Sequence, residues 1–166
     1  MDYYDKNRGV VYLYEKGSDG NFTQIDRLYT PEGTQVRAHL TDMIFLDDFL
    51  LVGAPGKNKV YVFQRGESGY DIMTELTPSG DLGPESSFGI SLDGKGTDVI
   101  VGDYGEQSSH LFSFEDGAWK QKATFDGFNT ALSGDSIMQH TPVTFETNGD
   151  GQYGGDVNFY DLVCEQ

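Results

Sequence analysis

The stretch Ser86-Ser87-Phe88-Gly89-Ile90-Ser91-Leu92 decides the fold of this chain, together with Asp98-Val99-Ile100-Val101-Gly102 and Leu111-Phe112-Ser113-Phe114, which follow it. In the first stretch, large apolar residues alternate with small ones, which is the period-two pattern of a strand buried on one face. The second is nearly all apolar, as expected of a strand covered on both faces. The third alternates again, so the three stretches predict three short strands in close succession.

Turn-forming residues separate these strands and add a fourth. Asp93-Gly94-Lys95-Gly96 favours a chain reversal after the first strand. Glu115-Asp116-Gly117 favours another before residues 118–125, which read as a further strand. Residues 86–125 are therefore predicted to form a four-stranded antiparallel meander.

The meander recurs along the chain. Val52-Gly53 precedes Val101-Gly102 by 49 residues (101 minus 52), and residues 60–63 precede residues 111–114 by 51. Val11-Tyr12-Leu13-Tyr14 precedes residues 60–63 by 49. A repeat of about 50 residues made of four strands is typical of a β-propeller blade, because one such sheet cannot bury its faces alone.

These repeated residues resemble a known family. Phe88-Gly89 followed by Val101-Gly102, and the intact Val52-Gly53-Ala54-Pro55, are similar to the FG-GAP repeat of integrin-alpha-type β-propellers. In that motif Phe-Gly is followed by a strand, often a cation loop, and then Val-Gly-Ala-Pro. The resemblance covers residues 9–126 well. It departs from the motif at His39-Leu40, where Phe-Gly would stand, and at Asp103-Tyr104, where Ala-Pro would stand.

The expected fold is all-β: a single β-propeller segment over residues 1–166, built of antiparallel four-stranded blades. About three blades are expected, with a partial one at 9–29, complete ones at 36–76 and 86–125, and a divergent one at 131–162. Propellers close with four to eight blades, so the chain is expected to be part of a longer one. A small complete β-sandwich is the alternative, and the last segment could instead supply a swapped strand to an earlier blade.

Packing between blades, rather than within one sheet, is expected to form the core. Six aromatic residues recur at equivalent strand positions and are expected to pack there: Tyr12, Tyr14, Tyr61, Phe63, Phe112 and Phe114.

Composition excludes several classes of partner. With 27 acidic and 11 basic residues the net charge is −16, which argues against nucleic acid and anionic membrane surfaces. No apolar run approaches the length that spans a membrane, so no membrane insertion is expected. The single cysteine, Cys164, cannot form a disulfide within the chain.

The best candidate for a metal site is the stretch 146–156. Calcium takes six to eight oxygen ligands from a flexible loop in which ligands alternate and a glycine makes the sharp turn. The predicted ligands are Glu146, Asn148, Asp150, Gln152 and Asp156. The stretch resembles the cation loop of FG-GAP blades, but Gly154 stands where a closing aspartate would. Weak calcium binding is therefore one interpretation, and a hairpin loop without an ion is the other.

Signals for catalysis are few. His39, His110 and His140 have no second ligand at a metal-binding spacing, and no nucleophile elbow, phosphate loop or dinucleotide fingerprint is present. Tyr104 and Trp119 are candidates for stacking on a sugar. Asn21-Phe22-Thr23 is a glycosylation sequon at a predicted hairpin tip.

The resemblance implies a non-catalytic binding or adhesion module, extracellular or at the cell surface, with a protein or glycan as ligand. The alternatives are a carbohydrate-binding lectin and the accessory domain of a carbohydrate-active or hydrolytic enzyme. Glycan binding without turnover would separate the binding classes from the enzymes.

Overall fold

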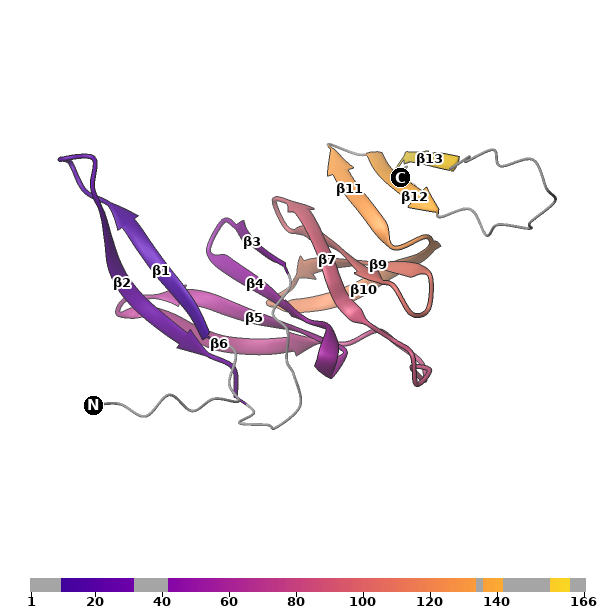
Figure 1. The fold of residues 1–166 in the computed structure, drawn as a ribbon, viewed down its shortest axis with the longest axis horizontal. Helices are drawn as coiled ribbons and strands as arrows, with labels where there is room; N and C mark the ends of the chain where they lie inside the picture. The colour runs from indigo at the N-terminus through magenta and orange to yellow at the C-terminus, as the bar shows by residue number, and fades with distance from the viewer. Residues whose placement is uncertain (1–9, 32–41, 134–135, 142–155, 162–166) are drawn as a thin grey trace, which may run out of the picture.

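The computed structural model describes residues 10–31, 42–133, 136–141 and 156–161, and it is all-β with antiparallel sheets (Figure 1). The first sheet contains β1 (Val10–Lys16) and β2 (Phe22–Tyr29). The second contains β3 (Met43–Leu46), β4 (Phe49–Ala54), β5 (Lys59–Gly66) and β6 (Gly69–Leu76), with a short 3-10 helix, η1 (Pro55–Lys57), between β4 and β5. The third contains β7 (Phe88–Lys95), β8 (Asp98–Asp103), β9 (Ser108–Glu115) and β10 (Ala118–Asp126). The fourth contains β11 (Asn129–Ser133), β12 (Ser136–Thr141) and β13 (Asp156–Asp161).

The predicted meander of residues 86–125 is confirmed as the third sheet, in which β7 to β10 pair in chain order. The first reversal lies later than predicted, because β7 continues through Asp93 and Gly94 to Lys95, which pairs with Asp98. The reversal between β9 and β10 lies where it was predicted. Asp116 and Gly117 have φ of 52° and 78°, the left-handed pair that two-residue hairpin turns require.

The earlier copies also form as predicted. The second sheet repeats the order of the third, and the predicted hairpin at the start of the chain is β1 and β2. The first strand of the blade expected at 36–76 is described only from Met43 onward, because 36–41 lie outside the described residues. In the last part of the chain, β11 to β13 pair with one another and form a sheet of their own.

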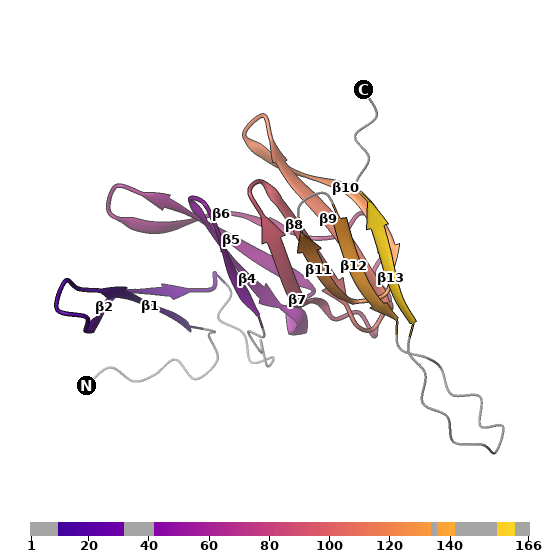
Figure 2. The same cartoon turned by 90° about the horizontal axis from the view of Figure 1, so that it is seen from above.

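The four sheets follow one another along the long axis of the molecule, and neighbouring sheets pack face to face (Figures 1 and 2). Three apolar clusters lie between them, so the prediction that contacts between sheets form the core is confirmed. Between the first and second sheets the main buried residues are Val11, Leu13, Leu28, Leu50, Val52, Tyr61 and Phe63. Between the second and third they include Leu51, Val60, Val62, Phe88, Val101 and Phe112, and between the third and fourth Ile100, Leu111, Leu132 and Ile137.

Two glycines at equivalent repeat positions let adjacent sheets approach. A Cβ atom on Gly53 of β4 would lie 2.1 Å from the carbonyl oxygen of Gly89 in the third sheet. A Cβ atom on Gly102 of β8 would lie 2.0 Å from the carbonyl oxygen of Phe128, just before β11. Real Cβ atoms do not come so close to backbone, so the Val-Gly pair recurs because the next sheet fills the space of a side chain.

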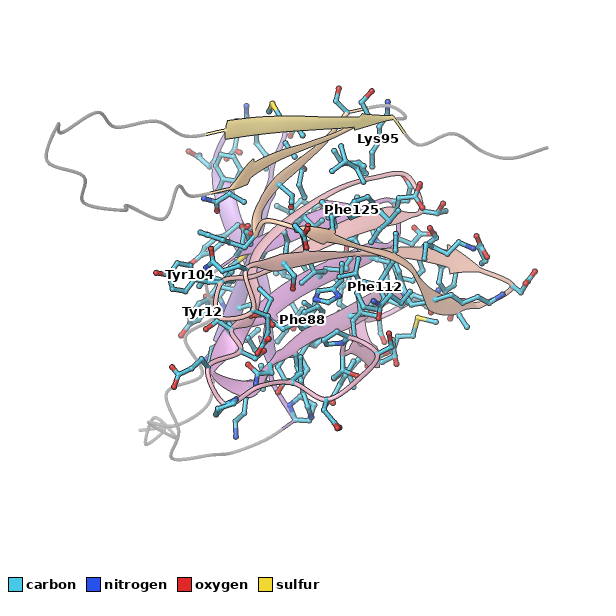
Figure 3. All side chains as sticks on the ribbon, turned by 90° about the vertical axis from the view of Figure 1, so that its right-hand side faces the viewer. Tyr12, Phe88, Lys95, Tyr104, Phe112 and Phe125 are labelled. Carbon is cyan, nitrogen blue, oxygen red and sulfur yellow. The ribbon has the colours of Figure 1, made fainter. Side chains whose placement is uncertain are left out.

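The prediction for the recurring aromatic residues is partly right. Tyr61, Phe63 and Phe112 are buried between sheets, and Phe114 packs partly buried against the same core. Tyr12 and Tyr14 are 44% and 57% exposed, so for them the prediction is wrong. Val11 and Leu13, which alternate with them along β1, take the face that meets the second sheet. Figure 3 shows Phe88 and Phe112 among the packed side chains of the layered sheets.

Candidate functional site

A groove lies between the first and second sheets, where the end of the β5–β6 hairpin passes β2. It has a volume of about 400 Å³. Its polar and aromatic lining residues are Asp26, Arg27, Tyr29, Ser68, Tyr70 and Asp71. An adjoining hollow of about 200 Å³ shares Asp26 and Tyr70 and adds Arg65 and Glu67. The groove therefore carries both signs of charge beside two tyrosines.

Local backbone geometry explains how the groove forms. Gly69, at the start of β6, has a φ of +137°, and a Cβ atom there would lie 3.0 Å from the carboxylate of Asp26. The positive φ of residue 69 favours glycine at the point where the hairpin passes Asp26 of β2. The Asp26 carboxylate also accepts a hydrogen bond of 2.7 Å from the backbone N–H of Arg27, which fixes it at the rim.

The tyrosines of the groove come from different repeats. Tyr29 is 49% exposed at the end of β2. Tyr70 is partly buried at the start of β6, where its ring centre lies 6.2 Å from that of Phe45. Sequence reasoning missed this groove because its walls are 40 residues apart in the chain and no local motif joins them. The one available signal was a tyrosine at one end of each of two strands, Tyr29 at the end of β2 and Tyr70 near the start of β6.

The structure does not bring the two predicted sugar-stacking residues together. Tyr104 is 56% exposed in the β8–β9 turn, where its ring meets that of Phe128 edge-on at 4.8 Å. Trp119, in β10, is partly buried beside the far end of β9, where it pairs with Phe114, and it contacts Phe49 of the second sheet, with ring centres 5.4 Å apart. About six residues of extended strand separate the two sites, which is roughly 20 Å. They are thus not parts of one site, and ligand binding at either stays a prediction.

The predicted glycosylation site is at an exposed position. Asn21 lies in the β1–β2 turn, where its backbone N–H and its side-chain amide both donate to the carboxylate of Asp19, at 3.0 and 2.8 Å. These hydrogen bonds hold the pKa of Asp19 below its usual value. Modification of Asn21 stays a prediction.

Four of the five predicted calcium ligands, Glu146, Asn148, Asp150 and Gln152, lie outside the described residues. The fifth, Asp156, is the first residue of β13, and its backbone pairs with Thr141 at the end of β12. The candidate loop therefore connects the second and third strands of its sheet. Calcium binding by this loop stays a prediction. In the part of the chain that the structure describes, no three metal-ligating side chains gather.

A serine and a histidine meet in the third sheet. Ser108 Oγ lies 3.2 Å from His110 Nε2, and His110 Nδ1 lies 3.2 Å from the Gln121 amide nitrogen and from the Thr124 hydroxyl. Because an amide nitrogen only donates, Nδ1 accepts and the proton of the neutral ring is on Nε2, donated to Ser108. This polarity is opposite to the one that activates a serine nucleophile.

The environment of His110 supports a packing role. The side chain is only 7% exposed, and its ring lies 5.5 Å from that of Phe88. Burial lowers the pKa of His110, and the nearby negative charge of Asp103 opposes that shift in part. The buried Asp103 carboxylate accepts from Ser86 Oγ and from the backbone N–H groups of Ser87, Gly105 and Glu106 at 2.6 to 3.2 Å. It thus joins two loops rather than orienting the histidine.

No helix in the described part of the chain is long and apolar enough to cross a membrane. A scan against models of protein families and a search of curated proteins both give no match to this chain. The family resemblance therefore depends on the motif residues alone and stays a prediction.

Proposed function

We propose that this chain is a non-catalytic binding module: a segment of an FG-GAP-like, integrin-alpha-type β-propeller that presents a ligand-binding groove. Two four-stranded sheets of the same order, stacked in the order of the chain, support the propeller interpretation. Among the described residues the first and last sheets lie at opposite ends of the stack (Figure 1). Closure of the sheets into a propeller ring is therefore part of the proposal.

The way the sheets stack is also repeated, as a propeller requires. β11 packs against β7 and β8, just as β7 packs against β3 and β4. Polar contacts join the same strands: Asp42, just before β3, accepts from the backbone N–H of Leu92 in β7 at 2.8 Å. Asp93 of β7 accepts from the backbone N–H of Leu132 in β11 at 2.7 Å. A stack of sheets in which the same packing arrangement occurs twice suits a scaffold that holds binding surfaces at its edges.

The groove between β2 and the β5–β6 hairpin is the observation that carries the binding function. Tyrosine rings beside carboxylates and arginine offer stacking surface, hydrogen-bond acceptors and donors in one concave place, which suits a protein loop or a glycan. The site is built on strands from two packed sheets, so it is held in shape before a ligand arrives. By the family resemblance, we place this binding at the cell surface or outside the cell.

A carbohydrate ligand is the second candidate. Sugars bind through their apolar faces to aromatic rings and through their hydroxyls to carboxylates, and the groove offers Tyr29 and Tyr70 with Asp26 and Asp71. This favours a lectin, or the accessory domain of a carbohydrate-active or hydrolytic enzyme, over a purely protein-binding module.

A glycan array and an array of extracellular protein domains, both probed with the purified chain, test the proposal. For any ligand found, Asp71→Ala and Tyr29→Ala should weaken binding at least tenfold, because both residues line the groove. Asp126→Ala, an exposed carboxylate at the end of β10, is the matched control and should leave affinity unchanged.

Three results would overturn this proposal. If Tyr104→Ala abolishes binding while the groove variants do not, the ligand binds at the β8–β9 turn instead. If neither array gives a ligand, the groove is not the binding site. Turnover of generic glycosidase or esterase substrates that a single carboxylate or serine substitution removes would contradict a non-catalytic module.

A further inference from the structure

The buried His110 is joined by hydrogen bonds to the connection between the second and third sheets. This connection runs over residues 77–87 and links β6 to β7. The backbone N–H of Ser79 donates to Gln121 Oε1 at 2.7 Å, and Gln121 Nε2 lies 3.2 Å from His110 Nδ1. The side chain of Gln121, in β10, therefore contacts the histidine ring with one atom and the connection with the other.

The donors and acceptors in this series are fixed by Ser79. A backbone N–H only donates, so the Gln121 atom that faces Ser79 is the amide oxygen, and the amide nitrogen is the atom that faces His110. Nδ1 of the ring must then accept. The proton of the neutral ring is on Nε2, 3.2 Å from Ser108 Oγ. These hydrogen bonds all fit the neutral form of His110.

Protonation of His110 is incompatible with this arrangement. The charged ring carries a proton on Nδ1 as well, which then faces the N–H groups of Gln121. Thr124 Oγ1, also 3.2 Å from Nδ1, can accept that proton, but Gln121 Nε2 lies 2.9 Å from the same hydroxyl and still faces the ring. Turning the amide over satisfies Nδ1 but places an amide N–H against the N–H of Ser79. The charged ring therefore displaces or turns Gln121, and both movements remove the acceptor of Ser79.

The other groups around the ring decide when it takes up a proton. From β7 the ring of Phe88 faces it at 5.5 Å, and the second sheet meets this face with the apolar cluster to which Phe88 belongs. From β8 the negative charge of Asp103 favours the protonated form, but burial of the ring has the larger effect and holds the pKa of His110 below its ordinary value of 6.5. The acidic residues of the connection, Asp81 and Glu85, are exposed. His110 is thus neutral near pH 7 and is protonated only in more acidic solution.

Separate contacts hold the second half of the connection. The backbone N–H of Gly83 donates to Glu106 Oε1 at 3.0 Å. Ser86 Oγ and the backbone N–H of Ser87 donate to the carboxylate of Asp103 at 2.6 and 2.7 Å. None of these three hydrogen bonds includes Gln121, so the loss of the Ser79 contact frees only the part of the connection that precedes Gly83.

We propose that His110 is a pH-sensitive switch: in acidic solution the protonated ring releases the first half of the 77–87 connection from β10, while the second half stays attached to the third sheet. The second sheet has no equivalent of this switch, because Lys59 stands at the position of His110 and forms an ion pair with Glu75 at 2.6 Å. The inference uses the contacts of the third sheet and does not depend on the ligand-binding groove.

Amide hydrogen exchange of Ser79, followed by NMR together with the titration of the His110 ring, tests this proposal. In the wild type, the protection of the Ser79 amide, relative to its intrinsic exchange rate at each pH, should fall about tenfold as the ring takes up its proton, because its hydrogen bond is lost. The two titrations should have the same midpoint. The Gly83 amide, whose acceptor is Glu106, should keep its protection and is the internal control.

Two variants separate the switch from a structural role of the ring. His110→Gln keeps a side chain that can accept from Gln121 but does not titrate, so the protection of Ser79 should be the same in neutral and in acidic solution. Gln121→Ala removes the acceptor, so Ser79 should be unprotected in both. Circular dichroism checks that each variant is folded.

Three results would overturn the proposal. Unchanged protection of Ser79 while the ring titrates would show that Gln121 stays in place beside a charged histidine. An equal fall in protection in His110→Gln would assign the pH effect to another group. Unfolding of the chain before the ring titrates would show that protonation accompanies global unfolding and not a local release.

Discussion

The second and third sheets have the same strand order and the same close glycine contact, but they fix the next two residues by different means. After Gly53 the second sheet has Ala54 and Pro55, both buried, and a single turn of 3-10 helix. After Gly102 the third sheet has Asp103, whose buried carboxylate accepts four hydrogen bonds from two loops. The close glycine contact, which both sheets share, is required by the stacking of the sheets. The residues after it show that the end of the strand can be fixed either by apolar packing or by a polar network.

The close glycine contact, which the two sheets share, predicts the largest effects on stability. Gly53→Ala and Gly102→Ala would each place a Cβ atom about 2 Å from backbone of the next sheet, which cannot move aside as a side chain can. Each should lower the free energy of unfolding by about 3 kcal/mol or more, measured by urea denaturation. Gly66→Ala is the control, because the nearest atoms to its Cβ would be at 3.7 Å. A cost at Gly53 or Gly102 no larger than at Gly66 would show that the sheets are not in this contact.

The hydrogen bonds of Asp103, which the second sheet lacks, predict a smaller effect on stability. Asp103→Ala leaves three backbone N–H groups and a hydroxyl without their acceptor, so it should lower the free energy of unfolding by about 2–3 kcal/mol. Asp103→Asn keeps one acceptor oxygen and should cost less. Equal costs for the two variants in urea denaturation would mean that the hydrogen bonds contribute little.

How far the sequence predicted this fold depends on where the determining contacts lie. Period-two patterns and turn residues identify β7 to β10 almost residue by residue, because both signals are local. They placed the first reversal too early, since Asp93 and Gly94 look like turn residues. Both pair with β8 instead, and Asp93 also accepts a hydrogen bond from the fourth sheet. At these two residues, tertiary contacts outweigh the local preference for a turn.

The faces of the strands were harder to predict than the strands. The repeat correctly placed Tyr61 and Phe112 in the core, but it assigned Tyr12 the same burial although no described sheet covers β1 on that side. The groove was missed because Asp26 and Gly69 approach only once two sheets have packed. Asp103 was recognised as a departure from the motif, but its four partners, spread over residues 86–106, have no signature in sequence.

His110 offers a pH test that the second sheet lacks, because residue 59 at the equivalent position is lysine. Burial lowers the pKa of His110 below 6.5 in the folded state, so between these two values the unfolded chain binds more protons than the folded one. The contribution of His110 to stability is therefore full above pH 6.5 and is lost as pH falls through the folded pKa. In urea denaturation, the stability difference between wild type and His110→Gln should shrink between pH 7.5 and pH 5. A difference independent of pH would contradict this.

The calcium prediction concerns the connection that is longest among the equivalent ones. β4–β5 and β8–β9 are joined by four residues each, whereas residues 142–155 join β12 to β13. If this connection binds calcium with a dissociation constant of about 10⁻⁴ to 10⁻³ M, ten times that concentration adds about 1.4 kcal/mol to the free energy of unfolding. The melting temperature should rise by a few degrees with calcium and fall with chelator, and Asp150→Ala should remove the response. An equal rise with sodium at matched ionic strength would show screening alone.

Trp119 tests most directly whether consecutive repeats pack face to face, because it is the single tryptophan of the chain and contacts Phe49 of the preceding sheet. Its fluorescence should be blue-shifted and protected from iodide in the native protein, and Phe49→Leu should shift the emission and increase quenching without unfolding the chain. Met73→Leu, on the outer strand of the same sheet, should change neither. Emission typical of exposed indole, or a spectrum unchanged by Phe49→Leu, would contradict face-to-face packing of the two complete sheets.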